Sequence, residues 1–358
     1  MVRRQTRVMQ VDPVHPSAEA LADAARMLRE GGLVVFPTET VYGLGAHARD
    51  ASAVRAIFEA KGRPSTDPLI VHVAAADDVA GLARLVPEAL PRLAARFWPG
   101  PLTMIVPKRA EIPDLVTAGL DTVAVRVPAH PVAQALLRAS GVPVAAPSAN
   151  TFSRPSPTQA SHVLADLDGL VDIVVDGGHT DIGLESTVLD LTVTPPVVRR
   201  PGGVSIDAIR ELLPDVQVVQ RASGASVAQV SPGQLLRHYA PKARMTLFEG
   251  DSQAVRTRVL ADARALLARG MRVGLLAPDE DIDTLQRALV ADTPALAMQR
   301  LGSRQDPDAV ARHLFDAIRR VDAARPDEIL AIGVGPEGIG LAIHDRLTRA
   351  SEGRVVRL

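Results

Sequence analysis

The chain has 358 residues, of which 47% are hydrophobic and 23% are charged, and its formal net charge is −1. This length suggests about two domains, and the near-neutral charge excludes a strong charge-driven attraction to nucleic acid. The absence of cysteine excludes disulfides, cysteine-ligated zinc, iron–sulfur clusters and thiol nucleophiles. No apolar run reaches the length of a membrane-spanning helix, and no apolar stretch typical of a signal peptide follows the basic N-terminus. We therefore expect a cytoplasmic protein without a membrane contact.

Residues 1–215 predict a domain with a mixed α/β sheet. Helical patterns lie at 17–30, 51–60, 76–84, 87–96 and 130–139. Strand patterns lie at 32–36, 69–73, 103–106, 122–127, 142–146, 171–175 and 187–191. Many strands with irregularly spaced helices favour a mixed, twisted sheet over a doubly wound one.

Residues 244–358 alternate regularly between strand and helix patterns. Strand patterns lie at 244–249, 272–277, 294–298, 328–334 and 354–358, and helical patterns at 252–269, 281–291, 306–324 and 338–350. This alternation predicts a smaller, Rossmann-like domain with a mostly parallel sheet covered on both faces. Residues 216–243 are small, polar and aperiodic in their first part, which is typical of a linker.

The sequence contains no P-loop motif, no zinc-binding histidine cluster and no nucleophile elbow. A glycine pattern, Gly333-x-Gly335-x-x-Gly338, follows a strand-like run and precedes a helical one. It has two interpretations, a structural turn or a dinucleotide-binding loop. Only 20 residues follow it, which favours the turn.

Polar turns after the strand patterns of the N-terminal domain are candidate ligand contacts. Lys61 and Arg63 lie two residues apart on a proline-flanked loop, which suits an anionic ligand such as phosphate. Ser148 and Asn150 could hydrogen-bond phosphate or sugar, although each such cluster is also explained by a turn or a helix cap. Arg126, within an apolar strand pattern, either points to solvent or is buried beside an anionic partner.

Several motifs together resemble the YrdC-like family over residues 17–203. They are Pro-Thr-Glu-Thr-Val-Tyr-Gly-Leu-Gly at 37–45, Lys61-x-Arg63, Trp-Pro-Gly-Pro-Leu-Thr at 98–103 and Ser148-x-Asn150, in the order found in that family. The later segment 231–242 resembles the linker of its longer, two-domain members, which are threonylcarbamoyl-AMP synthases. The resemblance implies a YrdC-like catalytic domain followed by a linker that serves as an active-site lid.

The activity implied by this resemblance is that of an adenylyltransferase. L-threonine, bicarbonate and ATP would give threonylcarbamoyl-AMP and pyrophosphate, with Mg²⁺ accompanying ATP and no protein-ligated transition metal. The product would pass to a downstream threonylcarbamoyl transferase complex, for N6-threonylcarbamoyladenosine at position 37 of tRNA.

The resemblance also implies site residues. The implied catalytic residues are Lys61, Arg63, Ser148 and Asn150. The implied threonine contacts are Thr40, His72, Arg126, the Ala146 backbone and Ser186. The implied ATP contacts are Arg63, Asp67, Thr122, Ser148, Ser156, Arg200 and Tyr239. The family commonly has asparagine at the position of Asp67, where a carboxylate would repel phosphate unless it contacts ribose or helps to hold Mg²⁺.

Four alternatives accompany this interpretation. His72 is either a positioning or structural histidine, which we favour, or a general base. A related hydrogenase-maturation carbamoyltransferase contains cysteine-rich zinc motifs, which this chain lacks. The protein could also be an RNA-binding module, but the net charge of residues 1–215 is negative, so we expect at most weak RNA contact. A separate nucleotide-binding role of the C-terminal domain rests on the glycine pattern alone.

Overall fold

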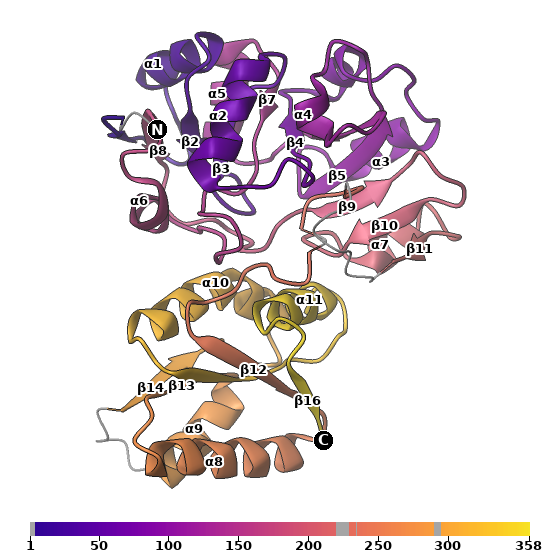
Figure 1. Ribbon diagram of the computed structural model, residues 1–358. Coiled ribbons are helices and arrows are strands. Elements are labelled where there is room, and N and C mark those ends of the chain that lie inside the picture. The colour runs from indigo at the N-terminus through magenta and orange to yellow at the C-terminus, as the bar shows by residue number, and fades with distance from the viewer. Residues whose placement is uncertain (1–3, 220–228, 234, 290–294) are drawn as a thin grey trace. The chain divides into compact units, whose positions relative to one another are not determined.

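A computed structural model describes residues 4–219, 229–233, 235–289 and 295–358 (Figure 1). Contacts between Cα atoms divide the chain into two units. The first unit contains the chain up to Phe152 and from Ser156 to Leu235, and the second contains Ser153–Pro155 and Leu236–Leu358. Part of the predicted linker, 220–228 and 234, lies outside the described residues. Among the residues described, no helix combines the length and apolarity needed to cross a bilayer.

The first unit contains an 11-stranded sheet with the order β1-β8-β2-β3-β7-β4-β6-β5-β9-β10-β11 over the described residues. Its strands are β1 (Arg7–Gln10), β2 (Val34–Phe36), β3 (Gly43–His47), β4 (Ile70–His72), β5 (Leu102–Pro107), β6 (Thr122–Arg126), β7 (Val144–Ala145), β8 (Ile173–Asp176), β9 (Thr187–Asp190), β10 (Val197–Arg200) and β11 (Gln217–Val218). The sheet contains parallel pairs such as β4–β6 and antiparallel pairs such as β5–β6, so the prediction of a mixed sheet is confirmed.

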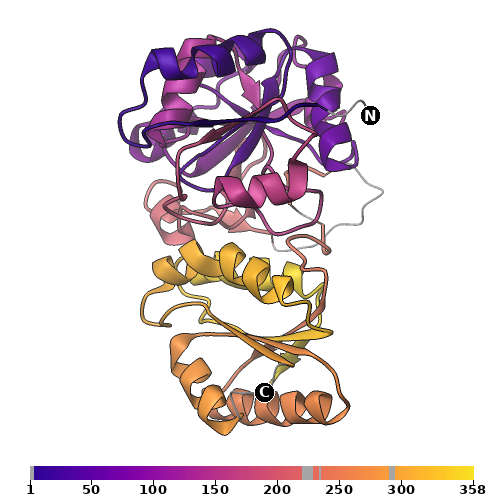
Figure 2. The ribbon, with the colours of Figure 1, turned by 90° about the vertical axis from the view of Figure 1, so that its left-hand side faces the viewer.

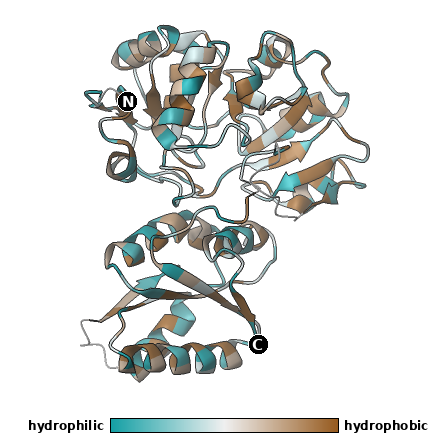
Figure 3. Cartoon of the chain, in the orientation of Figure 1, coloured by the Kyte–Doolittle hydropathy of each residue, from teal (hydrophilic) through white to brown (hydrophobic). Residues whose placement is uncertain are grey.

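Helices cover both faces of this sheet. They are α1 (Ala18–Arg29), α2 (Ala51–Lys61), α3 (Ala89–Phe97), α4 (Asp114–Thr117), α5 (Pro131–Ser140), α6 (Ala160–Leu167) and α7 (Ile206–Arg210). Side chains alternate between the faces of a strand, so Val34 and Phe36 of β2 face the core formed with α1 and α5, whereas Val35 faces the core that includes α2. Figure 2 shows these layers from the side, and Figure 3 shows that most strands are apolar.

Several short elements of the first unit were not predicted. They are β1, β3, β10, β11, α4, α6 and α7. The five residues of β3 include two glycines, and much of β1 is exposed, so neither strand has the apolar alternation of a typical strand. The helix predicted at 76–84 is a short 3₁₀ helix at Ala76–Gly81.

The described part of the second unit contains a five-stranded parallel sheet with the order β14-β13-β15-β12-β16. Its strands are β12 (Arg244–Glu249), β13 (Val273–Ala277), β14 (Leu296–Arg300), β15 (Glu328–Ile332) and β16 (Val355–Arg357), and its helices are α8 (Ser252–Ala268), α9 (Asp279–Ala288), α10 (Pro307–Ala323) and α11 (Gly340–Ala350). Helices α8 and α9 cover one face, and α10 and α11 cover the other (Figure 1). The predicted Rossmann-like architecture is confirmed.

The glycine pattern forms the turn between β15 and α11. Residues 335–338 of this turn are exposed. Gly338 has a positive φ of 55°, and a Cβ atom at Gly340 would lie 2.0 Å from the carbonyl oxygen of Gly335. The backbone of the turn therefore requires Gly338 and Gly340, which supports the interpretation of the pattern as a structural turn.

Candidate active site

Two neighbouring parallel strands place a histidine beside an arginine at one edge of the first sheet. His72 ends β4, Arg126 ends β6, and the two residues are register partners. Partners on adjacent strands point to the same face of a sheet. Ala146 follows β7 on the other side of β4, and its N–H donates to the carbonyl of Ile70 at 2.9 Å. Three residues predicted to contact threonine are therefore brought together.

Arg126 is buried, so of the two interpretations of this strand arginine the inward one holds. Its Nη2 lies 2.6 Å from Oε1 of Glu39, Nη1 donates to Oγ1 of Thr40 at 2.9 Å, and Nε donates to the carbonyl of Gly100 at 3.2 Å. Glu39 is itself buried, and its Oε2 accepts the N–H of Ala129 at 3.1 Å. A buried arginine needs an anionic partner, and here the chain supplies one.

Glu39 is a site residue that sequence reasoning missed. It lies within the motif at 37–45 and directly precedes Thr40, a predicted threonine contact. Two signals could have revealed Glu39. It stands next to a predicted contact, and a buried arginine needs a carboxylate as its partner.

His72 is buried against the edge of the Phe36 ring, with 6.3 Å between the ring centroids. Burial, reinforced by the positive charge of Arg126, lowers the pKa of His72 from 6.5 to about 3. The imidazole is therefore neutral near pH 7 and accepts a proton poorly. This favours a positioning role for His72 over that of a general base.

Ser186 connects the predicted threonine contacts to the predicted ATP contacts. Its Oγ lies 2.7 Å from Oγ1 of Thr103 on β5. Its carbonyl accepts two hydrogen bonds from Arg200, from Nη2 at 2.9 Å and from Nε at 3.2 Å. Arg200 ends β10, which pairs with β9 directly after Ser186. A predicted threonine contact and a predicted ATP contact are thus hydrogen-bonded neighbours.

Lys61 joins the two motifs that support the family resemblance. It is the last residue of α2, which Gly62 terminates with a positive φ of 64°. Its buried ammonium group donates to the carbonyl oxygens of Ser148, at 2.5 Å, and of Asn150. In return, the Lys61 carbonyl accepts the N–H of Phe152 at 2.8 Å. Lys61 therefore fixes the backbone of the Ser148-x-Asn150 turn.

Arg63 and Asp67 form a second buried ion pair. Nη2 of Arg63 lies 3.0 Å from Oδ2 of Asp67, and its Nε donates to the Asp67 carbonyl, also at 3.0 Å. Burial raises the pKa of the Asp67 carboxyl, and the charges of Arg63, Lys61 and Arg200 oppose this rise. Three cations surround one carboxylate, so the cluster has a net positive charge, which suits a polyphosphate.

One described part of the predicted linker, residues 229–233, packs against this cluster. The N–H of Gln229 donates to the Thr66 carbonyl at 2.9 Å, and Nη1 of Arg200 donates to the Pro232 carbonyl at 3.3 Å. Gln229 and Ser231 are buried, and Oγ of Ser231 has no hydrogen-bond partner among the described residues. Residues 229–233 therefore contact Arg200, a predicted ATP contact, and the loop that contains Thr66.

The remaining predicted ATP contacts are Thr122, Ser156 and Tyr239. Oγ of Ser156 donates to Oε1 of the buried Glu185, a second residue that sequence reasoning missed. Thr122 begins β6, four residues before Arg126 and so roughly 13 Å away along the strand. Tyr239 belongs to the second unit.

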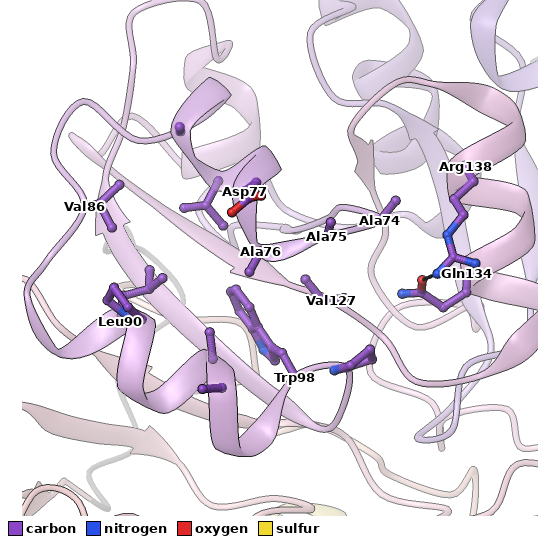
Figure 4. A pocket seen from close by; sticks show the side chains of 16 residues that line it. Ala74, Ala75, Ala76, Asp77, Val86, Leu90, Trp98, Val127, Gln134 and Arg138 are labelled. Carbon is purple, nitrogen blue, oxygen red and sulfur yellow. Dashed lines mark hydrogen bonds between the residues drawn. The ribbon is translucent and has the colours of Figure 1, made fainter.

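A cavity of about 840 Å³ lies elsewhere in the first unit (Figure 4). Its walls include Leu90, Trp98 and Val127, with Gln134 and Arg138 on one side. Nη2 of Arg138 donates to Oε1 of Gln134 at 2.8 Å. None of the predicted site residues lines this cavity.

Comparison with known families identifies both parts of the chain. The profile described as telomere recombination, which covers Sua5, YciO and YrdC proteins, matches residues 26–202. The profile described as threonylcarbamoyl-AMP synthase, C-terminal domain, matches residues 204–352. The fold and the clustered motifs thus define a two-domain protein with a YrdC-like first domain.

Relatives that match nearly the whole chain show which family within this class it belongs to. Threonylcarbamoyl-AMP synthase from Pyrococcus abyssi is 44% identical over 94% of this chain and 95% of its own length. The enzyme of the same name from Bacillus subtilis is 42% identical over 97% of both chains. The crystal structure of P. abyssi Sua5 complexed with L-threonine matches with a TM-score of 0.91 and 42% identity, over 98% of this chain and 99% of that one. The chain belongs to the threonylcarbamoyl-AMP synthase family.

Proposed function

We propose that the chain makes threonylcarbamoyl-AMP and pyrophosphate from L-threonine, bicarbonate and ATP. The observation that carries this proposal is the identity of 42–44%, over nearly the whole chain, to threonylcarbamoyl-AMP synthases. The bound L-threonine of the P. abyssi structure supports threonine as the amino acid substrate.

The reaction needs two bond-forming steps. The free amine of threonine condenses with bicarbonate, which gives a carbamate and water. A carbamate oxygen then attacks the α-phosphorus of ATP, and the bond from that phosphorus to the β-bridging oxygen breaks as pyrophosphate leaves. Neither step uses a covalent enzyme intermediate, so the side chains act by positioning and by stabilising charge.

The threonine half of the site is built around Arg126. We propose that its guanidinium pairs with the substrate carboxylate while Glu39 and Thr40 fix its orientation. The neutral ring of His72, the backbone of Ala146 and the hydroxyl of Ser186 complete this half.

The ATP half is built around cations whose positions are fixed by backbone carbonyls. Arg63 and Arg200 would stabilise the charge of the phosphates, and their hydrogen bonds to carbonyl oxygens orient them in advance. Lys61 contributes charge and holds the turn that presents Ser148 and Asn150. Further nucleotide contacts are assigned to Thr122, Ser156 and Tyr239. Residues 229–233, as part of the lid, would exclude water from the labile carbamate.

Mg²⁺ would enter this site with ATP. The described residues contain no group of three or more carboxylates and histidines arranged to hold a metal, which fits an ion held mainly by phosphate oxygens. Asp67 is the carboxylate among the proposed nucleotide contacts and is the residue we assign to that ion. When bound, Mg²⁺ would neutralise charge on the departing pyrophosphate.

The product is a mixed anhydride that must be used before it hydrolyses. We propose that it passes to a downstream threonylcarbamoyl transferase that modifies position 37 of tRNA, which implies a cytoplasmic location. The net charge of −1 gives direct RNA binding no general electrostatic support.

Pyrophosphate release from ATP and Mg²⁺ tests the proposed function. The assay compares a complete mixture with mixtures lacking threonine or bicarbonate, and with one in which serine replaces threonine. Release that requires both threonine and bicarbonate is expected. Release that requires neither would indicate a simple pyrophosphohydrolase and would contradict the proposal, as would bound ATP without any release.

A further inference from the structure

Three residues from within the sequence of the catalytic domain belong to the second unit. They are Ser153–Pro155, whereas the chain on either side of them belongs to the first unit. Phe152 is hydrogen-bonded to Lys61, and Ser156 to Glu185. The chain therefore leaves the first unit directly after the Ser148-x-Asn150 turn and returns to it at a proposed ATP contact.

Asp322, on the last turn of α10, binds Arg154, the middle residue of these three. Its Oδ2 accepts from Nη2 of Arg154 at 2.8 Å and from the N–H of Lys242 at 3.0 Å, and its Oδ1 accepts from the N–H of Ala243 at 3.0 Å. The carboxylate is 7% exposed. A negative charge is unfavourable at the C-terminal end of a helix, so helix stability does not explain an aspartate at this position, whereas its three donors do.

The two segments that meet at Asp322 are also joined to each other. The N–H of Ala240 donates to the Ser153 carbonyl at 2.7 Å, and Nη1 of Arg154 donates to the Ala240 carbonyl at 3.3 Å. Ser153 and Tyr239 have positive φ values of 65° and 60°. This conformation is costly for residues other than glycine and persists where surrounding contacts impose it. We call Ser153–Pro155, Tyr239–Ala243 and Asp322 the clamp.

Side-chain packing fixes Tyr239, which begins the linker segment of the clamp. The ring of Tyr239 is fully buried, with its centroid 5.3 Å from that of Phe315 on α10. The guanidinium carbon of Arg346, on α11, lies 5.1 Å from the same ring centroid. Both helices that cover this face of the second sheet therefore determine where Tyr239 lies.

We infer that Asp322 is a positioning residue for the nucleotide half of the site. It fixes Ser153–Pro155, which directly precede Ser156, and residues 242–243, which follow Tyr239. The inference rests on the proposed function, in which Ser156 and Tyr239 contact ATP. The threonine half contains only residues of the first unit and includes no residue of the clamp. Loss of the carboxylate should therefore impair the use of ATP and spare threonine.

The test uses the full-length protein and the variant Asp322→Asn. The amide of asparagine has one acceptor oxygen where the carboxylate has two, and its N–H groups face a group that is itself a donor. The hydrogen bonds of the clamp are therefore weakened, although the side chain keeps its shape. The KM for ATP is expected to rise about tenfold, while threonine affinity, measured by calorimetry, changes less than about twofold. The matched control is Asp316→Asn on the same helix, whose partner Arg320 is exposed. Neither quantity should change in the control.

A second variant keeps the inference testable if Asp322→Asn does not fold. Arg154→Gln removes the same ion pair from the loop side, and we expect the same selective rise of the KM for ATP. In the double variant, the rise of the KM for ATP should be smaller than the product of the two single rises, because both changes break the same contact between Arg154 and Asp322. An unchanged KM for ATP in a folded single variant would overturn the inference, as would equal losses for ATP and threonine.

Failure of the proposed function is visible separately. It would appear in the unmodified protein as pyrophosphate release that ignores threonine and bicarbonate. In that case, direct titration of the variants with ATP still measures the effect of Asp322, and unchanged ATP affinity would overturn the inference.

Discussion

The guanidinium of Arg126 and the carboxylate of Glu39 form an ion pair inside the first unit, with 2.6 Å between Nη2 and Oε1 and less than a tenth of either side chain exposed. Because Glu39 already compensates the buried charge, Arg126 is ordered before any substrate arrives. An incoming threonine carboxylate therefore has to share the guanidinium with Glu39. We therefore expect Glu39 to contribute to the stability of the fold. We expect Arg126 to contribute to the affinity for threonine.

Glu39→Gln should lower the stability of the protein. The amide leaves the Arg126 charge buried without compensation, which typically costs about 3–5 kcal/mol. Thermal or urea unfolding measures the loss. Asp23→Asn is the matched control, because Asp23 pairs with Arg7 at the surface with about half of each side chain exposed, and its removal should cost less than about 1 kcal/mol. Equal stability of the two variants would contradict the buried pair.

Arg126→Ala should act mainly on threonine. Truncation of one partner in a buried charged contact typically costs about 2–5 kcal/mol of binding free energy, so the KM for threonine should rise by roughly a hundredfold. The KM for ATP should change much less. Arg138→Ala, at the cavity of Figure 4, serves as the control and should leave both constants unchanged. A defect confined to ATP would show that Arg126 does not bind the threonine carboxylate.

Asp67→Asn should change how stability depends on pH. Burial raises the pKa of this carboxyl above its ordinary value of 3.8. The folded state then binds the proton more tightly than the unfolded state, so this contribution to stability is complete below pH 3.8 and is lost as pH rises through the raised pKa.

The asparagine variant cannot titrate at this position, so its stability relative to the unmodified protein should increase from about pH 4 to 8. Unfolding curves across that range provide the measurement. Asp207→Asn, at an exposed pair with Arg210, should show no such trend. A variant whose relative stability falls with pH would mean that attraction to Arg63 outweighs burial.

His72 should remain uncharged through the physiological range. Its pKa is lowered from 6.5 to about 3, so the unfolded state takes up a proton first as pH falls. Stability that is present above pH 6.5 is therefore lost as pH falls toward 3. His72→Gln should weaken this loss, whereas the same change at the exposed His15 should not. Titration of the His72 ring between about pH 5 and 8, followed by NMR, would refute the assignment.

The sequence predicted the second unit best, because its helices and strands each have a clear periodicity. All of its described strands and helices occur where the patterns placed them, to within a few residues. In the first unit, β3 was missed because Gly43 and Gly45 lack the side chains of a typical strand. Gly45 is required there because a Cβ atom would lie 2.8 Å from the side chains of Phe36 and Val144. Close packing of that kind leaves no periodic signal in the sequence.

Site residues were predictable to the extent that they belong to local motifs. Lys61 and Ser148 could be selected from their segments, yet only the fold reveals that the lysine binds backbone carbonyls of the serine turn. The roles of Glu39 and Asp322 depend on partners distant in sequence, Arg126 and Arg154. Pairings at such separations follow from topology, which a single sequence does not specify.

The pairing of the first strand has a consequence for biosynthesis. Strand β1 pairs with β8, and Thr6 donates a hydrogen bond to the carbonyl of Val171, 165 residues further along the chain. A ribosome needs about ten to thirty seconds to make a segment of that length. During this time β1 has no native partner, so the central strands of the first sheet are expected to assemble before its first strand joins them. Strand β1 therefore stays unpaired until β8 has been synthesised. Chaperones have their longest opportunity to bind at this strand.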